Sequence, residues 1–126
     1  MSTQVATAGW PPAGDVFDSA CPSRSVLDHV TSKWAVLVLA ALTTGPLRFS
    51  ALRRRIDGVS EKMLSQTLRT LEADGFVARE VAPTTPPQVT YSLTDLGLGL
   101  TEHLTGLLDF ITTRIPDIES ARGSRQ

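Results

Sequence analysis

The chain has 126 residues, of which 41% are hydrophobic, and this length and composition predict one domain with its own core. Lys and Arg total 12 against 13 Asp and Glu, so the net charge of −1 excludes a uniformly basic nucleic-acid coat. The longest apolar run, residues 34–42, is shorter than the roughly 20 residues that cross a bilayer. With a single Cys and no export signal, we expect a cytoplasmic protein without membrane contact.

The chain divides by composition into three parts. Residues 1–20 mix Thr, Ala, Gly and Pro without helical periodicity, which predicts a flexible arm. Periodic apolar segments follow over residues 21–118, which predicts the folded domain, and residues 119–126 are expected to form a tail.

Two helices are predicted at the start of the domain. The first covers residues 22–31, because apolar residues recur there at helical spacing and Pro22 suits the first helical position. The second covers residues 33–43 and is apolar nearly all round, as expected for a helix at the centre of a small domain. Gly45 and Pro46 end it.

Two more helices, joined by a short turn with Gly, are predicted between residues 48 and 75. The first ends at Asp57-Gly58, and the second begins after Ser60, a good N-cap, and ends at Gly75. Its apolar face is expected to include Met63. This is the helix-turn-helix pattern, although an ordinary helical hairpin with a solvated polar face fits this segment equally well.

A β-hairpin directly after these helices favours the DNA-binding alternative. Alternation predicts strands over residues 76–81 and 89–93, separated by a loop with three prolines. The fold class expected is therefore a mainly α winged helix-turn-helix with a small β-hairpin wing. Double-stranded DNA is the expected partner, with base contacts from the second helix and phosphate contacts from the first helix and the wing. The residues expected to bind DNA are Arg48, Ser50, Arg53, Arg54, Ser60, Lys62, Ser65, Gln66, Arg69, Arg79, Thr84 and Thr85.

The charge distribution supports this placement. Residues 48–79 contain seven Lys or Arg and four Asp or Glu, which gives +3 in a chain whose total is −1. A local excess of cations favours phosphate binding through the release of counterions from DNA.

The final helix, expected over residues 94–115, carries one long apolar stripe and places Thr101 on the opposite, polar face. Such a stripe is either part of the chain's own core or a dimer interface, and its coiled-coil-like spacing favours the interface. We expect a homodimer through the terminal helices, with the interface formed by Val26, Val30, Leu100, Leu104, Leu107, Leu108, Ile111 and Ile115.

A set of residues in a specific order and spacing extends over residues 21–100: Cys21-Pro22, Lys33-Trp34, Gly45-Pro46-Leu47-Arg48-Phe49, Leu52-Arg53, Ile56, Gly58-Val59-Ser60, Leu64, Leu68, Leu71-Glu72, Asp74-Gly75-Phe76-Val77, Pro86-Pro87, Val89-Thr90-Tyr91-Ser92-Leu93-Thr94 and Gly97. In these residues the chain resembles the HxlR-type branch of winged helix-turn-helix transcriptional regulators, which is related to the MarR family. Two positions depart from the resemblance: Ser32, where Gly is common, and Gln88, where a basic residue is common.

The resemblance implies a homodimeric regulator, expected to be a repressor, that places residues 60–74 in the major groove of a pseudo-palindromic operator. It also implies that Cys21 matches the cysteine of a redox-sensing subset of the family. At the start of a helix and one turn before Arg24, a thiolate is favoured, although a purely structural N-cap fits the same position. With one Cys, oxidation would produce a bridge between subunits or a mixed disulfide with a small thiol.

Other chemistry has little support in the sequence. One Cys with His29 and His103 does not make a zinc spacing, so no metal and no other cofactor is expected. No catalytic motif is present, and we expect no enzyme. Two alternatives remain: a small-molecule effector in a dimer cavity near Trp34, or a winged-helix protein-interaction module without DNA binding.

Overall fold

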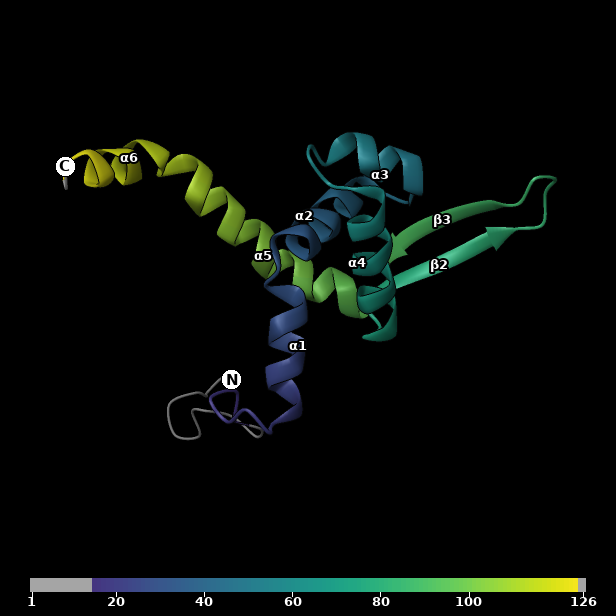
Figure 1. Ribbon diagram of the computed structural model, residues 1–126, viewed down its shortest axis with the longest axis horizontal. Helices are drawn as coiled ribbons and strands as arrows, with labels where there is room; N and C mark the ends of the chain where they lie inside the picture. The colour runs from purple at the N-terminus through teal and green to yellow at the C-terminus, as the bar shows by residue number, and fades with distance from the viewer. Residues whose placement is uncertain (1–14, 125–126) are drawn as a thin grey trace.

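A computed structural model describes residues 15–124 of the chain. Six α-helices, a short 3₁₀ helix and three strands occur in the described part (Figure 1). In chain order they are α1 (Pro22–Val30), α2 (Lys33–Ala41), η1 (Leu42–Thr44), β1 (Leu47–Arg48), α3 (Phe49–Arg55), α4 (Glu61–Ala73), β2 (Val77–Ala82), β3 (Gln88–Leu93), α5 (Asp95–Thr113) and α6 (Ile115–Gly123).

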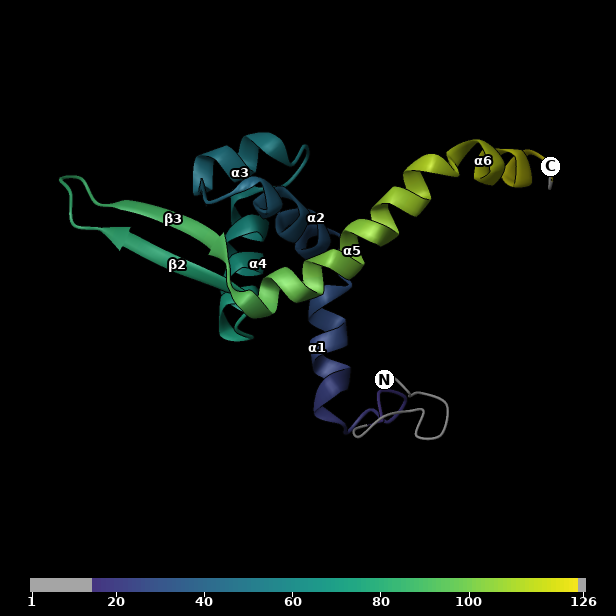
Figure 2. The ribbon, with the colours of Figure 1, turned by 180° about the vertical axis from the view of Figure 1, so that it is seen from behind.

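The core lies around α2, which explains why that helix is apolar on almost every side. The most deeply buried side chains of the two central helices are Val38 and Leu39 of α2 and Leu64, Leu68 and Leu71 of α4. Helix α5 covers another side of α2, and the hairpin β2–β3 projects away from this body (Figures 1 and 2). Met63, expected on the apolar face of α4, is exposed, because it lies at the border of that face and lines a small open cavity instead of the core.

Local sequence signals set the boundaries of helix α4. Ser60 is its N-cap, and the Ser60 hydroxyl accepts a hydrogen bond from the Met63 amide at 3.0 Å. Gly58 and Gly75, before and after the helix, have φ of +87° and +86°, a region that other residues adopt only with strain. The predicted turns are therefore confirmed at both ends of α4.

The wing is a three-stranded antiparallel sheet with the order β1-β3-β2. The hairpin predicted from alternation is confirmed, but no pattern in the sequence indicated β1, which pairs Leu47 with Tyr91 and Arg48 with Thr90. Two residues are too few to show alternation, so this strand depends on its partner for definition.

Helix α5 is oriented differently from the expectation. Gly97, Thr101 and Leu104 face the chain's own core, and the Thr101 hydroxyl donates to the Gly97 carbonyl oxygen at 2.6 Å. This internal bond satisfies the hydroxyl and permits its burial, so the polar-face assignment of Thr101 was wrong. Leu104 and Val30, which were expected at a dimer interface, are buried in the chain's own core.

The C-terminal segment is more helical than expected. Helix α5 ends at Thr113, and α6 begins at Ile115 with Pro116 in its first turn. Residues 119–123 of the expected tail therefore belong to α6, which extends away from the body (Figure 1). Within residues 15–124, no single helix is long and apolar enough to span a membrane, and only α1 together with residues 33–44, bent by 71°, reaches the length.

Candidate nucleic-acid interface

Helix α4 separates a buried apolar face from an exposed polar one. Lys62, Gln66 and Arg69 are exposed, and Ser65 is partly exposed beside them. The Arg69 guanidinium donates to the Ser65 hydroxyl at 3.0 Å, one helical turn away. The four side chains expected to contact bases, Lys62, Ser65, Gln66 and Arg69, thus lie on the solvent-facing side of α4. The hydrogen bond to Ser65 orients the Arg69 side chain.

Arg53 of α3 lies next to the start of α4. Ser50, Arg53 and Arg54 surround a shallow open hollow on α3, and Arg48 is exposed immediately before the helix. Arg53 Nη1 is 3.6 Å from Glu61 Oε2, which joins the last turn of α3 to the first turn of α4. Ser50, Arg53 and Arg54, three of the residues expected to bind DNA, are therefore neighbours on one exposed side of α3.

The three wing residues are separated along the hairpin. Arg79 is exposed in the middle of β2, opposite Tyr91, whereas Thr84 and Thr85 lie exposed in the loop between β2 and β3. The Thr84 hydroxyl donates to the Pro86 carbonyl oxygen at 2.8 Å, so its proton is already used within the loop. Thr85 and Arg79 are therefore better placed than Thr84 to donate to a phosphate.

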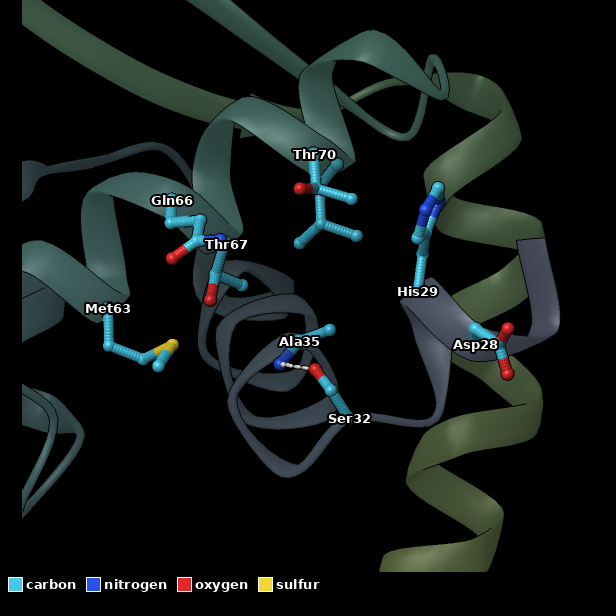
Figure 3. A pocket seen from close by; sticks show the side chains of 9 residues that line it. Asp28, His29, Ser32, Ala35, Met63, Gln66, Thr67 and Thr70 are labelled. Atoms are coloured by element: carbon cyan, nitrogen blue, oxygen red, sulfur yellow. Dashed lines mark hydrogen bonds between the residues drawn. The ribbon is translucent and has the colours of Figure 1, made fainter. Parts of the chain in front are cut away.

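A small cavity lies between α1, the start of α2 and α4, and no sequence pattern indicated it (Figure 3). Its volume is about 190 Å³, and Gln66 lines it together with Thr67 and Thr70 of α4 and with Asp28 and His29 of α1. Gln66 thus borders both the exposed polar face of α4 and this cavity.

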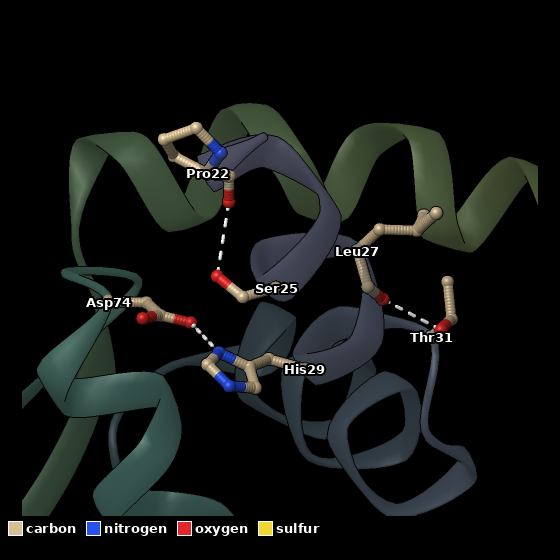
Figure 4. Close-up of polar contacts among 6 residues, drawn as sticks. All are labelled: Pro22, Ser25, Leu27, His29, Thr31 and Asp74. Carbon is tan, nitrogen blue, oxygen red and sulfur yellow. Dashed lines mark hydrogen bonds and ion pairs between the residues drawn. The ribbon is translucent and has the colours of Figure 1, made fainter. Parts of the chain in front are cut away.

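His29 connects α1 to the end of α4 (Figure 4). Its Nδ1 lies 2.6 Å from Oδ2 of Asp74, the C-cap residue of α4, and both side chains are partly buried. This pair joins residues 45 positions apart and links α1 to the end of α4. Sequence spacing alone could not reveal it.

Cys21 is the N-cap of α1 and is partly exposed. Its side chain makes no capping hydrogen bond, and its Sγ is 3.0 Å from the Ser23 hydroxyl oxygen. Arg24, expected to favour the thiolate, instead donates from Nη2 to the Phe17 carbonyl oxygen at 3.4 Å. The geometry therefore confirms the helix-start position of Cys21 but not the direct role of Arg24.

A second cavity, of about 340 Å³, lies between α2, the end of α3 and α5. Trp34, expected beside an effector cavity, does not line this cavity. The Lys33 ammonium lies over the Trp34 ring, 4.3 Å from its centre, and the ring is close to Gly58. An effector site near Trp34 stays a prediction. The walls of the second cavity are formed by Leu37, Ala40, Ala41, Arg55, Ile56, Asp57 and Leu108.

The apolar stripe of α5 divides between the core and the surface. Leu104 is buried, and Leu100 and Leu108 are partly buried against the core. Leu107 and Ile111 remain 51% and 41% exposed. Of the other residues near the expected interface, Ile115 and the neighbouring Phe110 are exposed, and Val26 of α1 packs partly against the core.

Comparison with known proteins agrees with this architecture. Residues 29–119 match the model of the HxlR-like helix-turn-helix family. The chain is 52% identical to the HTH-type transcriptional regulator YtfH of Escherichia coli (strain K12) over 112 residues, which cover 89% of each chain.

Solved structures show the same fold. YtfH of Salmonella typhimurium has a TM-score of 0.83 and 50% identity, covering 87% of this chain and 98% of that one. The redox regulator HypR in its reduced form has a TM-score of 0.72 and 34% identity, covering 79% and 98%. Diamide-treated YodB of B. subtilis has a TM-score of 0.64 and 31% identity, covering 76% and 96%. With its wing, its paired helices α3 and α4 and a family match over most of its length, the chain belongs to the HxlR-like helix-turn-helix family of transcriptional regulators, which are DNA-binding proteins and not enzymes.

Proposed function

We propose that the protein is a homodimeric repressor that binds a pseudo-palindromic operator in the cytoplasm, with α4 of each subunit in the major groove. The observation that carries this proposal is the exposed set of Lys62, Gln66 and Arg69 on α4, flanked by the cations of α3. These residue types donate to guanine acceptors, bond adenine and neutralise phosphates.

A homodimer fits the surface of α5. Leu107 and Ile111 form an exposed apolar edge on a helix that leaves the body of the subunit (Figure 2). A second copy of the chain would cover this edge and set two α4 helices about 34 Å apart, the spacing of half-sites one turn apart on DNA. Linking two modest sites in this way increases affinity without new base contacts.

We expect Arg69→Ala and Arg54→Ala to weaken DNA binding in different ways. Arg69 lies on the reading face, so its loss should cost about 1–3 kcal/mol at one operator position and relax the base preference there. Arg54 lies on α3, so its loss should weaken binding to all sequences and reduce the slope of log affinity against log salt by about 0.9. The measurement is selection from a random duplex library, followed by salt titration of the selected DNA.

Arg122→Ala is the matched control, because Arg122 is an exposed cation on α6, away from the proposed interface. It should leave both the base preference and the salt slope unchanged. Equal, sequence-independent losses from Arg69→Ala and Arg54→Ala would show that α4 does not read bases. If the wild type binds no duplex even at low salt, the protein-interaction alternative replaces the DNA-binding proposal.

A redox response through Cys21 is a second candidate function. Cys21 is partly exposed at the start of α1, and the His29–Asp74 contact joins the other end of α1 to α4. Two similar solved structures concern a redox regulator and a diamide-treated regulator. Oxidation of Cys21, as a bridge between subunits or a mixed disulfide, would reposition α1 and through it the reading helix.

Cys21→Ser should abolish an oxidant response while leaving DNA affinity under reducing conditions unchanged. The wild type, treated with diamide, should change its operator affinity by about tenfold and recover with dithiothreitol, which corresponds to about 1.4 kcal/mol. Gel-shift titrations of both proteins, with mass spectrometry of Cys21, provide the measurement. Equal responses of the two proteins would exclude Cys21 as the sensor.

A further inference from the structure

Glu61 is an acidic side chain at the place where a DNA-binding helix needs to approach a polyanion. It is the first residue of α4, directly after the N-cap Ser60, and its side chain is 75% exposed. In helix-turn-helix proteins the N-terminal residues of the second helix lie at the base edges. Lys62 follows it, and Arg53 lies beside it.

Two structural roles explain this carboxylate only in part. A negative charge in the first turn stabilises a helix, but this contribution is small at an exposed position. It does not by itself explain a carboxylate in the turn that would approach DNA. The pair with Arg53 is long, at 3.6 Å between Nη1 and Oε2, and both partners are at least half exposed. Exposed pairs of this kind contribute little to stability because solvent screens them.

The hydrogen-bonding pattern of the major groove gives Glu61 a specific role. A carboxylate only accepts hydrogen bonds, so guanine and thymine, which present acceptors there, repel it. Adenine presents its amino donor beside the N7 acceptor, whereas cytosine presents an amino donor with no acceptor of its own in the major groove. Among the described residues, the one ion pair of the Glu61 carboxylate is between its Oε2 and Arg53. Its Oε1 can therefore accept a hydrogen bond from another donor.

We propose that Glu61 is a specificity-determining residue that selects cytosine at one operator position through the N4 amino group. This inference rests on the proposed placement of α4 in the major groove. Arg53 then serves both the carboxylate and the adjacent phosphate, so it offsets the repulsion between Glu61 and the DNA backbone. Lys62 and Arg69 carry the affinity of this helix, and Glu61 penalises wrong bases at its position.

The test is selection from a random duplex library with the full-length wild type, Glu61→Ala and Glu61→Gln. The wild type should select a motif with cytosine at one position in each half-site. Glu61→Ala should lose that preference, by about 5- to 150-fold between cytosine and the other bases, and keep the other positions. Glu61→Gln should move the preference at the same position from cytosine to adenine, because an amide pairs bidentately with adenine.

Glu72→Gln is the matched control, since it removes an exposed carboxylate from the last turn of the same helix. It should preserve the cytosine preference. Thermal melting of each variant, followed by circular dichroism, identifies any loss of folding. If Glu61→Ala unfolds, Glu61→Gln still tests the proposal, because it retains the size of the side chain.

Three outcomes separate the possibilities. Uniformly tighter binding by both Glu61 variants, with the base preferences of the wild type intact, would overturn the proposal and reduce Glu61 to a helix-start charge that repels phosphate. A preference for adenine in the wild type at this position would also overturn the cytosine assignment. A wild type that selects no motif would contradict the proposed function itself, and the inference would end with it.

Discussion

Gly97→Ala is expected to lower the free energy of unfolding by about 3 kcal/mol, the upper part of the range for overpacking a close contact. A Cβ at Gly97 would overlap the carbonyl oxygen of Phe76, a backbone atom that cannot move aside like a flexible side chain. That carbonyl also accepts a hydrogen bond from the Thr94 amide at 3.1 Å. The Thr94 hydroxyl in turn accepts from the Gly97 amide at 3.0 Å and donates to the Gly75 carbonyl oxygen at 2.6 Å.

These hydrogen bonds join the end of α4, the hairpin and the start of α5. A displacement of the backbone at Gly97 would therefore disturb the packing of all three elements. Chemical denaturation followed by circular dichroism measures the effect. Gly99→Ala is the control two residues along the same helix, where a Cβ would meet open space. It should stabilise the protein by up to about 1 kcal/mol, because Ala is a better helix former than Gly. Equal stabilities for the two variants would show that α5 does not approach Phe76 this closely.

Leu107→Glu is expected to convert the proposed homodimer to monomers and to weaken operator binding by at least about 100-fold. Leu107 is 51% exposed in a single subunit, so the substitution should leave the fold of that subunit intact. In the proposed dimer the leucine would be covered, and two buried, unpaired carboxylates at a two-fold interface are strongly unfavourable. The loss of operator affinity reflects the loss of avidity between two half-sites.

Light scattering gives the oligomeric state, and gel-shift titration with full and half operators gives the affinity. Thr113→Glu is the control, because Thr113 is exposed at the end of α5, off the apolar stripe, and receives the same charge. It should remain dimeric with wild-type affinity. A Leu107→Glu variant that stays dimeric would place the interface elsewhere on the molecule.

Much of the fold could be predicted because its signals are local. The Ser60 cap and the turns at Gly58 and Gly75 depend on side chains and backbone conformations within a few residues. The hairpin follows from alternation and the apolar helix α2 from its composition. The polar face of α4 follows from helical periodicity, so its cations and Gln66 could be named before their arrangement was known.

The candidate site was predicted less completely. Periodicity predicts which residues share a face, but not the contact between Arg69 and Ser65 or the one between Arg53 and Glu61. Those contacts depend on rotamers and on how α3 packs against α4. The role proposed for Glu61 does not follow from sequence patterns, because the helix dipole already favours a carboxylate in the first turn of a helix.

The sequence by itself determined the positions of helices α1 to α5, the Ser60 cap, the β2–β3 hairpin and most residues on the exposed face of α4, but not β1 or α6. Only the tertiary structure decided which part of the α5 stripe enters the core, because an apolar side chain can be buried equally well against its own chain or a partner. It turned Thr101 inward, since the Gly97 carbonyl accepts its hydroxyl proton, and left Leu107 at the surface. It also brought His29 to Asp74 across 45 positions, a contact set by the packing of α1 against α4 and invisible to local patterns.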